Sequence, residues 1–167
     1  NDERICIWDL FNEPGNANRD TISVPHVQRM FDIARSCNPI QPLTSGVWTN
    51  PSNPKPAEVT AMENSDIISF HSYCKLPVSV CFIEELKEWG RPLIITEWLH
   101  RCVYNTVEEM FPLFYLEKIG CWNWGFVAGP SQTYEPWELT WAFYEKGQEV
   151  DVTADFGADQ QFGYKGT

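Results

Sequence analysis

The chain has 167 residues, of which 43% are apolar and 14% aromatic, and this is enough to fill the core of one domain. Twenty-three acidic residues against twelve Lys and Arg give a formal net charge of −11, and the lack of a basic cluster argues against nucleic acid and anionic membranes as partners. No apolar run reaches the roughly 18 residues of a membrane span, and the six cysteines form no C-x-x-C pair typical of a zinc knuckle.

Short apolar runs alternate along the chain with segments of helical period. The apolar runs predict strands at about residues 4–11, 42–47, 67–71, 92–97 and 120–126. The segments between them predict helices near 25–37, 57–64, 79–89 and 105–118, the last opened by a capping box of Asn105 and Glu108. Nothing between the strands is typical of a hairpin, so the pattern indicates parallel βα units. A barrel and an open doubly wound sheet both satisfy this pattern.

Two glutamates stand at the ends of predicted strands. Glu13 follows the first strand and Glu97 ends the fourth. An acidic residue in that place lies at the rim of a parallel sheet, where α/β folds keep their active sites, so the sequence predicts an enzyme. Asp9 faces away from Asn12 by strand alternation, and we expect it to form a structural pair beneath a helix.

Four motifs in order resemble the family 5 glycoside hydrolases and their clan relatives; they are Asn12-Glu13-Pro14, His71-Ser72-Tyr73, Thr96-Glu97-Trp98 and Trp124. The resemblance covers about residues 4–137. It implies an α/β fold, a partial (β/α)8 TIM-type barrel whose five parallel strands correspond to the fourth through eighth of the family. The first three βα units are missing, together with an Arg and a His that the family carries on them. We therefore expect a C-terminal piece of a longer enzyme, with a partial catalytic barrel at 1–147 and an irregular tail at 148–167.

The resemblance also implies an activity, the hydrolysis of β-linked poly- or oligosaccharides by a retaining double displacement. Glu13 would be the general acid and base, and Glu97 the nucleophile, kept ionised by hydrogen bonds. Tyr73 would hydrogen-bond the nucleophile, while His71 would support the acid or contact the sugar, and Asn12 would bind the 2-hydroxyl. The aromatic sugar platforms would be Trp124 at the cleavage point and Trp48 and Trp98 beside it.

Several alternatives stay open at this stage. Cellulase-, mannanase-, xylanase- and β-galactosidase-like activities all fit, and a piece of a barrel is expected to hydrolyse weakly or not at all. A non-catalytic carbohydrate-binding remnant is the second reading. An aldolase-type lyase is the third, although every lysine falls in a predicted loop or helix rather than at a strand end.

Cofactors, partners and compartment complete the expectations. No cofactor or metal is expected, since the three histidines lie far apart in sequence. Unpaired sheet edges make self-association an expectation for a partial barrel. The compartment is unknown from the residues, and the family resemblance suggests a secreted or periplasmic protein.

Overall fold

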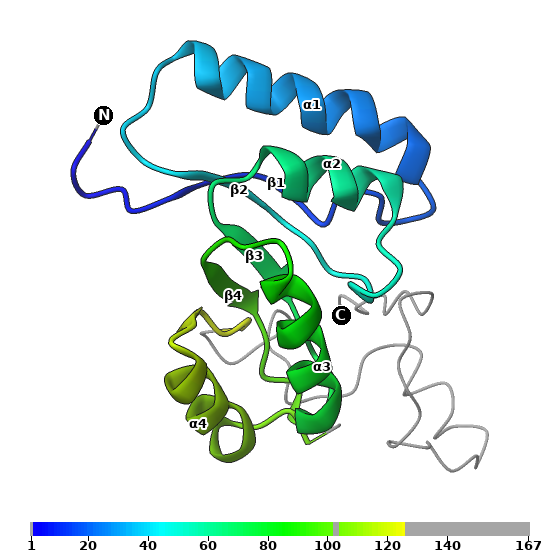
Figure 1. The fold of residues 1–167 in the computed structure, drawn as a ribbon, viewed down its shortest axis with the longest axis vertical. Helices are drawn as coiled ribbons and strands as arrows, with labels where there is room; N and C mark the ends of the chain where they lie inside the picture. The colour runs from blue at the N-terminus through cyan, green and yellow to red at the C-terminus, as the bar shows by residue number, and fades with distance from the viewer. Residues whose placement is uncertain (1, 102–103, 126–167) are drawn as a thin grey trace.

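The computed structural model describes residues 2–101 and 104–125, in which five strands alternate with four helices (Figure 1). In chain order these are β1 Trp8–Asn12, α1 Asp20–Ser36, β2 Leu43–Gly46, α2 Pro56–Asn64, β3 Ile68–His71, α3 Leu76–Lys87, β4 Leu93–Glu97, α4 Val107–Glu117 and β5 Gly120–Cys121. The predicted alternation of strands and helices is confirmed. β1 begins later than predicted, and α1 and α3 begin earlier. Residue 126 of the last predicted strand and the predicted tail at 148–167 lie outside the described residues.

The strands pair in parallel and form two small sheets. β1 pairs with β2, and β3, β4 and β5 form the second sheet. A parallel bridge between Val47 and Phe70 joins the two sheets, so neighbouring strands in space are also neighbours in the chain. The predicted parallel α/β arrangement is confirmed in this coarser form. Residues 2–101 and 104–125 close no barrel, and the partial barrel stays a prediction.

The hydrophobic core lies between the helices and one face of the strands. α1 contributes Val27 and Phe31, and α4 contributes Met110 and Phe114, in both cases one helical turn apart. Alternate strand residues meet these side chains, namely Leu43, Val47, Ile68, Phe70, Leu93 and Ile95. Burying one such side chain stabilises the fold by roughly 1.5–3 kcal/mol, so this contact fixes the strands relative to the helices.

The opposite face of β1, β2 and β3 carries polar side chains. Thr44 Oγ1 donates to Ser69 Oγ at 2.9 Å, and Ser69 Oγ lies 3.4 Å from a carboxylate oxygen of Asp9. Gly46 N also donates to Asp9, at 3.3 Å. Asp9 therefore lies on the sheet face turned away from the helical core, and the prediction that it pairs beneath a helix is wrong. The reason is the register of β1 and β2, in which Asp9 lies opposite Thr44 and shares its polar face.

Candidate active site

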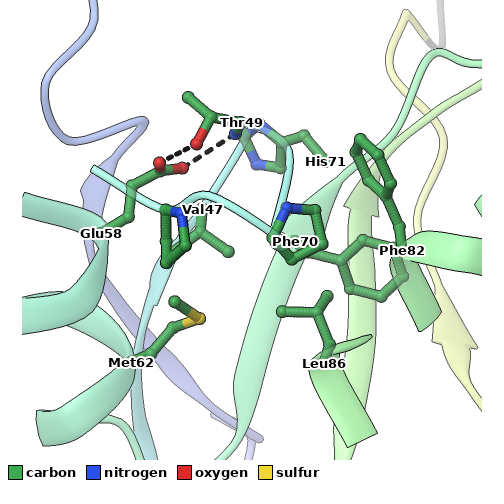
Figure 2. Close-up of a pocket in the computed structure, with 10 residues that line it drawn as sticks. Val47, Thr49, Glu58, Met62, Phe70, His71, Phe82 and Leu86 are labelled. Carbon is green, nitrogen blue, oxygen red and sulfur yellow. Dashed lines mark hydrogen bonds between the residues drawn. The ribbon is translucent and has the colours of Figure 1, made fainter. Parts of the chain in front are cut away.

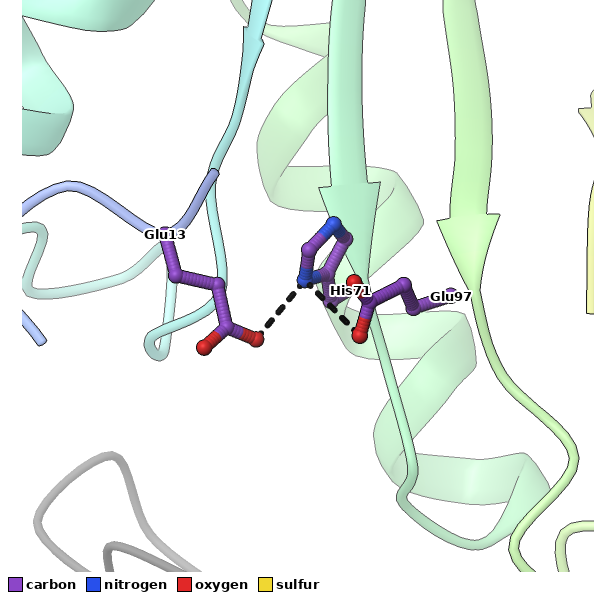
Figure 3. Close-up of side chains that lie close together, drawn as sticks. All are labelled: Glu13, His71 and Glu97. Carbon is purple, nitrogen blue, oxygen red and sulfur yellow. Dashed lines mark hydrogen bonds and ion pairs between the residues drawn. The ribbon is translucent and has the colours of Figure 1, made fainter. Parts of the chain in front are cut away.

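The carboxyl ends of β1, β3 and β4 bring Glu13, His71 and Glu97 together. His71 Nδ1 lies 2.8 Å from Glu13 Oε1 and 3.5 Å from Glu97 Oε2. Figure 3 shows the imidazole between the two carboxylates. Parallel strands end at the same edge of a sheet, so residues far apart in sequence converge there. The predicted meeting of the two glutamates in one place is confirmed.

Both carboxylates are open to solvent while the imidazole is not. The exposed fraction of the side chain is 18% for Glu13, 13% for Glu97 and 2% for His71. One oxygen of each carboxylate and a nitrogen of His71 all lie within 4.8 Å of one another. Two carboxyl groups this close, with access to solvent, can act on the same bond of a bound molecule. The same three atoms are also spaced for a metal ion, which the distance between histidines in the sequence did not predict.

Glu13 is held in an unusual backbone conformation. Its φ is +47°, in the left-handed region that residues with a Cβ seldom occupy. The Glu13 N–H donates to Gly46 O at 3.0 Å, and Asn16 Nδ2 donates to Glu13 Oε2 at 2.6 Å. These two contacts fix the turn and leave Oε1 directed at His71. Asn16 was not among the predicted site residues, although it is only three residues after Glu13 in the chain.

Glu97 is held by Tyr73, as predicted. Tyr73 Oη donates to Glu97 Oε2 at 2.7 Å. Burial raises the pKa of Glu97, and the nearby His71 and the Tyr73 hydrogen bond offset only part of this rise. Burial, and not hydrogen bonding, therefore has the larger effect on the pKa of Glu97, contrary to the expectation. Burial and the neighbouring carboxylate of Glu97 also raise the pKa of Tyr73 far above its ordinary value, so its hydroxyl stays a donor.

The His71 ring packs closely against Gly46. A Cβ placed on Gly46 would lie 2.8 Å from His71 Nε2, closer than side-chain atoms approach one another. The same point lies 3.6 Å from Asp9 Oδ2. Asp9 thus borders the Nε2 side of the ring, while the two glutamates face Nδ1. Burial raises the pKa of Asp9, which the backbone N–H of Gly46 and the nearby His71 partly offset.

Asn105 connects the loops that follow β3 and β4. Its Oδ1 accepts from Leu99 N at 2.5 Å and His100 N at 3.3 Å, and its Nδ2 donates to Cys74 O at 2.6 Å and Ser72 O at 3.3 Å. Asn105 is fully buried. The predicted capping box is wrong, because Thr106 caps α4 by accepting from Glu109 N. Asn105 instead joins the loop carrying Tyr73 to the one that follows Glu97.

The three tryptophans predicted as sugar platforms differ in their exposure to solvent. Trp98 is 4% exposed and packs edge-on against Phe114 with ring centroids 5.1 Å apart, so its prediction as a platform is wrong. Its place in the core follows from contact with α4. Trp48 is half-buried beside the turn of Glu13, since its Nε1 donates to Pro14 O at 3.3 Å. Trp124 is 42% exposed, and its backbone N–H donates to Trp98 O at 3.1 Å. The Lys55 ammonium lies over the Trp48 ring, 5.3 Å from its centroid, whereas the Trp124 ring is exposed.

Asn12 is exposed at the end of β1, beside Glu13 in the chain. Its backbone lies in register with Gly46 of β2, where the pairing of the two strands is irregular. This position is compatible with the predicted contact to a sugar hydroxyl, which stays a prediction.

A small cavity is lined in part by His71 (Figure 2). Its lining is mainly apolar and includes Val47, Met62, Phe70 and Leu86. It has about 10 Å³ of room for the centre of a water molecule, which is the lower limit for holding one water. A sugar ring does not fit there. Glu58 stands at its edge and accepts hydrogen bonds from Thr49, so this buried acid anchors the loop after β2.

Comparison with models of protein families, with curated proteins and with solved structures gives no match to this chain. None of the described helices has the length and apolar character needed to cross a lipid bilayer. The functional interpretation therefore depends on the geometry and chemistry of the site itself.

Proposed function

We propose that the site at the carboxyl ends of β1, β3 and β4 hydrolyses β-glycosidic bonds by a retaining double displacement. The observation that carries the proposal is the convergence of Glu13 and Glu97, with one oxygen of each within 4.8 Å. Retaining glycosidases hold their two carboxyl groups about 5–5.5 Å apart, while inverting enzymes need a gap of about 6.5–9.5 Å for a water molecule. The approach of one oxygen of each carboxylate to within 4.8 Å supports the retaining alternative, in which one carboxylate attacks directly.

The proposed reaction has two steps. Glu13 protonates the departing glycosidic oxygen while Glu97 attacks the anomeric carbon and forms a glycosyl–enzyme ester. Glu13, now a carboxylate, then takes a proton from water, and the resulting attack on the anomeric carbon releases Glu97. Tyr73 donates to Glu97 Oε2 and stabilises its negative charge, and His71 lies against the Glu13 oxygen that would carry the proton.

The two roles come from the family resemblance, and the electrostatics of the site make their assignment worth testing. The pKa of Glu97 is raised by burial, which is a property more typical of the acid than of the nucleophile. Hydrogen bonding by Tyr73 and the proximity of His71 act in the opposite direction and favour the ionised form. Which glutamate is the acid and which is the nucleophile is therefore a separate question from whether the two act as a pair.

Hydrolysis of aryl β-glycosides with good and poor leaving groups tests both points. We expect slow release by the 167-residue chain, abolished by Glu97→Gln for both substrates. Glu13→Gln should slow the poor leaving group by about 10²–10⁴-fold and the good one much less, because only the poor one needs a proton. Glu85→Gln, at an exposed acid on α3, is the matched control. Release that Glu97→Gln leaves intact would contradict the proposal.

A carbohydrate-binding site without catalysis is the second candidate function, and the exposed ring of Trp124 favours it. Flat aromatic rings bind the C–H faces of sugars. Oligosaccharide binding measured by calorimetry, weakened by Trp124→Ala and unchanged by Glu97→Gln, with no aryl glycoside hydrolysis, would favour this function over cleavage.

A further inference from the structure

We propose that Glu13, His71 and Glu97 form a binding site for a divalent transition-metal ion. The three ligand atoms come from three different strands and lie within 4.8 Å of one another. His71 Nδ1 is 2.8 Å from Glu13 Oε1 and 3.5 Å from Glu97 Oε2. An ion bound at about 2.0–2.2 Å from each ligand keeps neighbouring ligand atoms about 3–3.5 Å apart. The side chains therefore need only small movements to surround an ion.

Neighbouring side chains already orient both carboxylates. Asn16 Nδ2 donates to Glu13 Oε2 at 2.6 Å, which leaves Oε1 facing His71. Tyr73 Oη donates to Glu97 Oε2 at 2.7 Å. Metal-binding carboxylates in proteins usually have such outer hydrogen bonds, because these fix the ligand before the ion arrives. These two hydrogen bonds therefore hold both carboxylates in place around His71.

The imidazole is oriented for the same purpose. A metal bound at Nδ1 requires the ring proton on Nε2, and the Asp9 carboxylate borders that side of the ring across Gly46. The ring itself is only 2% exposed and held between β2 and the two glutamates, so it has little freedom to turn away.

The ligand set indicates the class of ion. Two carboxylates balance a charge of two, and one imidazole favours first-row transition metals over Ca²⁺ and Mg²⁺, which prefer oxygen ligands alone. Glu13 and Glu97 are 18% and 13% exposed, so solvent can fill the remaining coordination positions. Where the site cleaves sugars, an ion would engage both carboxylates and inhibit cleavage; this consequence rests on the proposed function, whereas the binding itself does not.

Titration with Mn²⁺, followed by the electron paramagnetic resonance of the free ion, tests the proposal without any sugar. Mn²⁺ is the probe because the exposed thiols of Cys6, Cys37 and Cys81 are soft ligands that it binds poorly. We expect one strong site per chain, weakened at least about tenfold by Glu13→Gln and by Glu97→Gln, as for loss of a metal-supporting group. Glu85→Gln removes the same charge from α3 and should leave the affinity unchanged. Equal affinity in all four proteins would overturn the proposal.

Nuclear magnetic resonance gives a second readout that needs no variant. Bound Mn²⁺ should first broaden the amide signal of Gly46, which lies against the His71 ring. Broadening that instead begins at exposed acids such as Glu85 would show surface attraction by a chain of net charge −11 and contradict the site. Because hydrolysis is not measured, failure of this proposal and failure of the proposed function are distinguishable.

Discussion

Replacement of Asn105 by alanine tests how the ends of β3 and β4 are held together. The Asn105 amide makes two short hydrogen bonds, accepting from Leu99 N at 2.5 Å and donating to Cys74 O at 2.6 Å. It makes two longer ones at 3.3 Å, accepting from His100 N and donating to Ser72 O. A buried hydrogen bond between neutral groups contributes about 1 kcal/mol, and more where its loss leaves a polar group unsatisfied. We expect Asn105→Ala to lower the free energy of unfolding by about 2–4 kcal/mol.

Thermal unfolding followed by circular dichroism measures this loss. For a domain of this size, a change of 1 kcal/mol shifts the melting temperature by about 2–4 °C, so Asn105→Ala should melt about 10 °C lower. Asn53→Ala is the matched control, because Asn53 is exposed in the loop after β2. A melting temperature for Asn105→Ala within about 1 °C of this control would refute the role of Asn105 as a connector, since the expected loss is several times larger.

The remaining predictions concern single side chains of the site. Tyr73→Phe removes a donor to Glu97, so the pKa of Glu97 should rise further in a carbon-13 carboxyl titration; an unchanged pKa would argue against the bond. Gly46→Ala should destabilise the fold by about 1–3 kcal/mol in chemical denaturation, because the new methyl group meets His71 Nε2; wild-type stability would mean that the ring has room. Burial raises the folded-state pKa of Glu97 above its unfolded value. The contribution of Glu97 to stability therefore falls as the pH rises from the unfolded pKa through the folded pKa. Glu97→Gln should therefore melt higher than the wild type near neutral pH and lose this advantage below the unfolded pKa; a variant less stable at both pH values would contradict the burial effect.

Local pattern was sufficient to predict the order of elements and the place of the site. Each strand that ends in a site residue is a short apolar run, and parallel strands deliver their carboxyl ends to one edge. Glu13, His71 and Glu97 were predicted there for this reason, and the contact from Tyr73 to Glu97 is confirmed. These features depend on alternation along single strands, which a sequence records directly.

Features that depend on contacts between distant segments were not predicted. Trp98 belongs to the core because Phe114 of α4 packs against it, and nothing in the residues around Trp98 records that contact. The residues around Asn105 are typical of a helix cap, yet its amide forms hydrogen bonds with Leu99 and Cys74, in two loops that the fold brings together. The face that Asp9 occupies likewise depends on its register with Thr44 of β2, which the residues of β1 alone do not record.

Covalent trapping tests most directly whether Glu13 and Glu97 act as a pair on one sugar. An activated aryl 2-deoxy-2-fluoro-β-glycoside slows both steps of a double displacement but slows the release of the ester more, so the intermediate accumulates. Mass spectrometry of proteolytic peptides should find the sugar on Glu97, in the wild type and in Glu13→Gln, and no sugar on Glu97→Gln. A label on Glu13 would reverse the two roles. Intact protein that carries no label, across glucoside, mannoside and cellobioside reagents, would contradict cleavage by this pair.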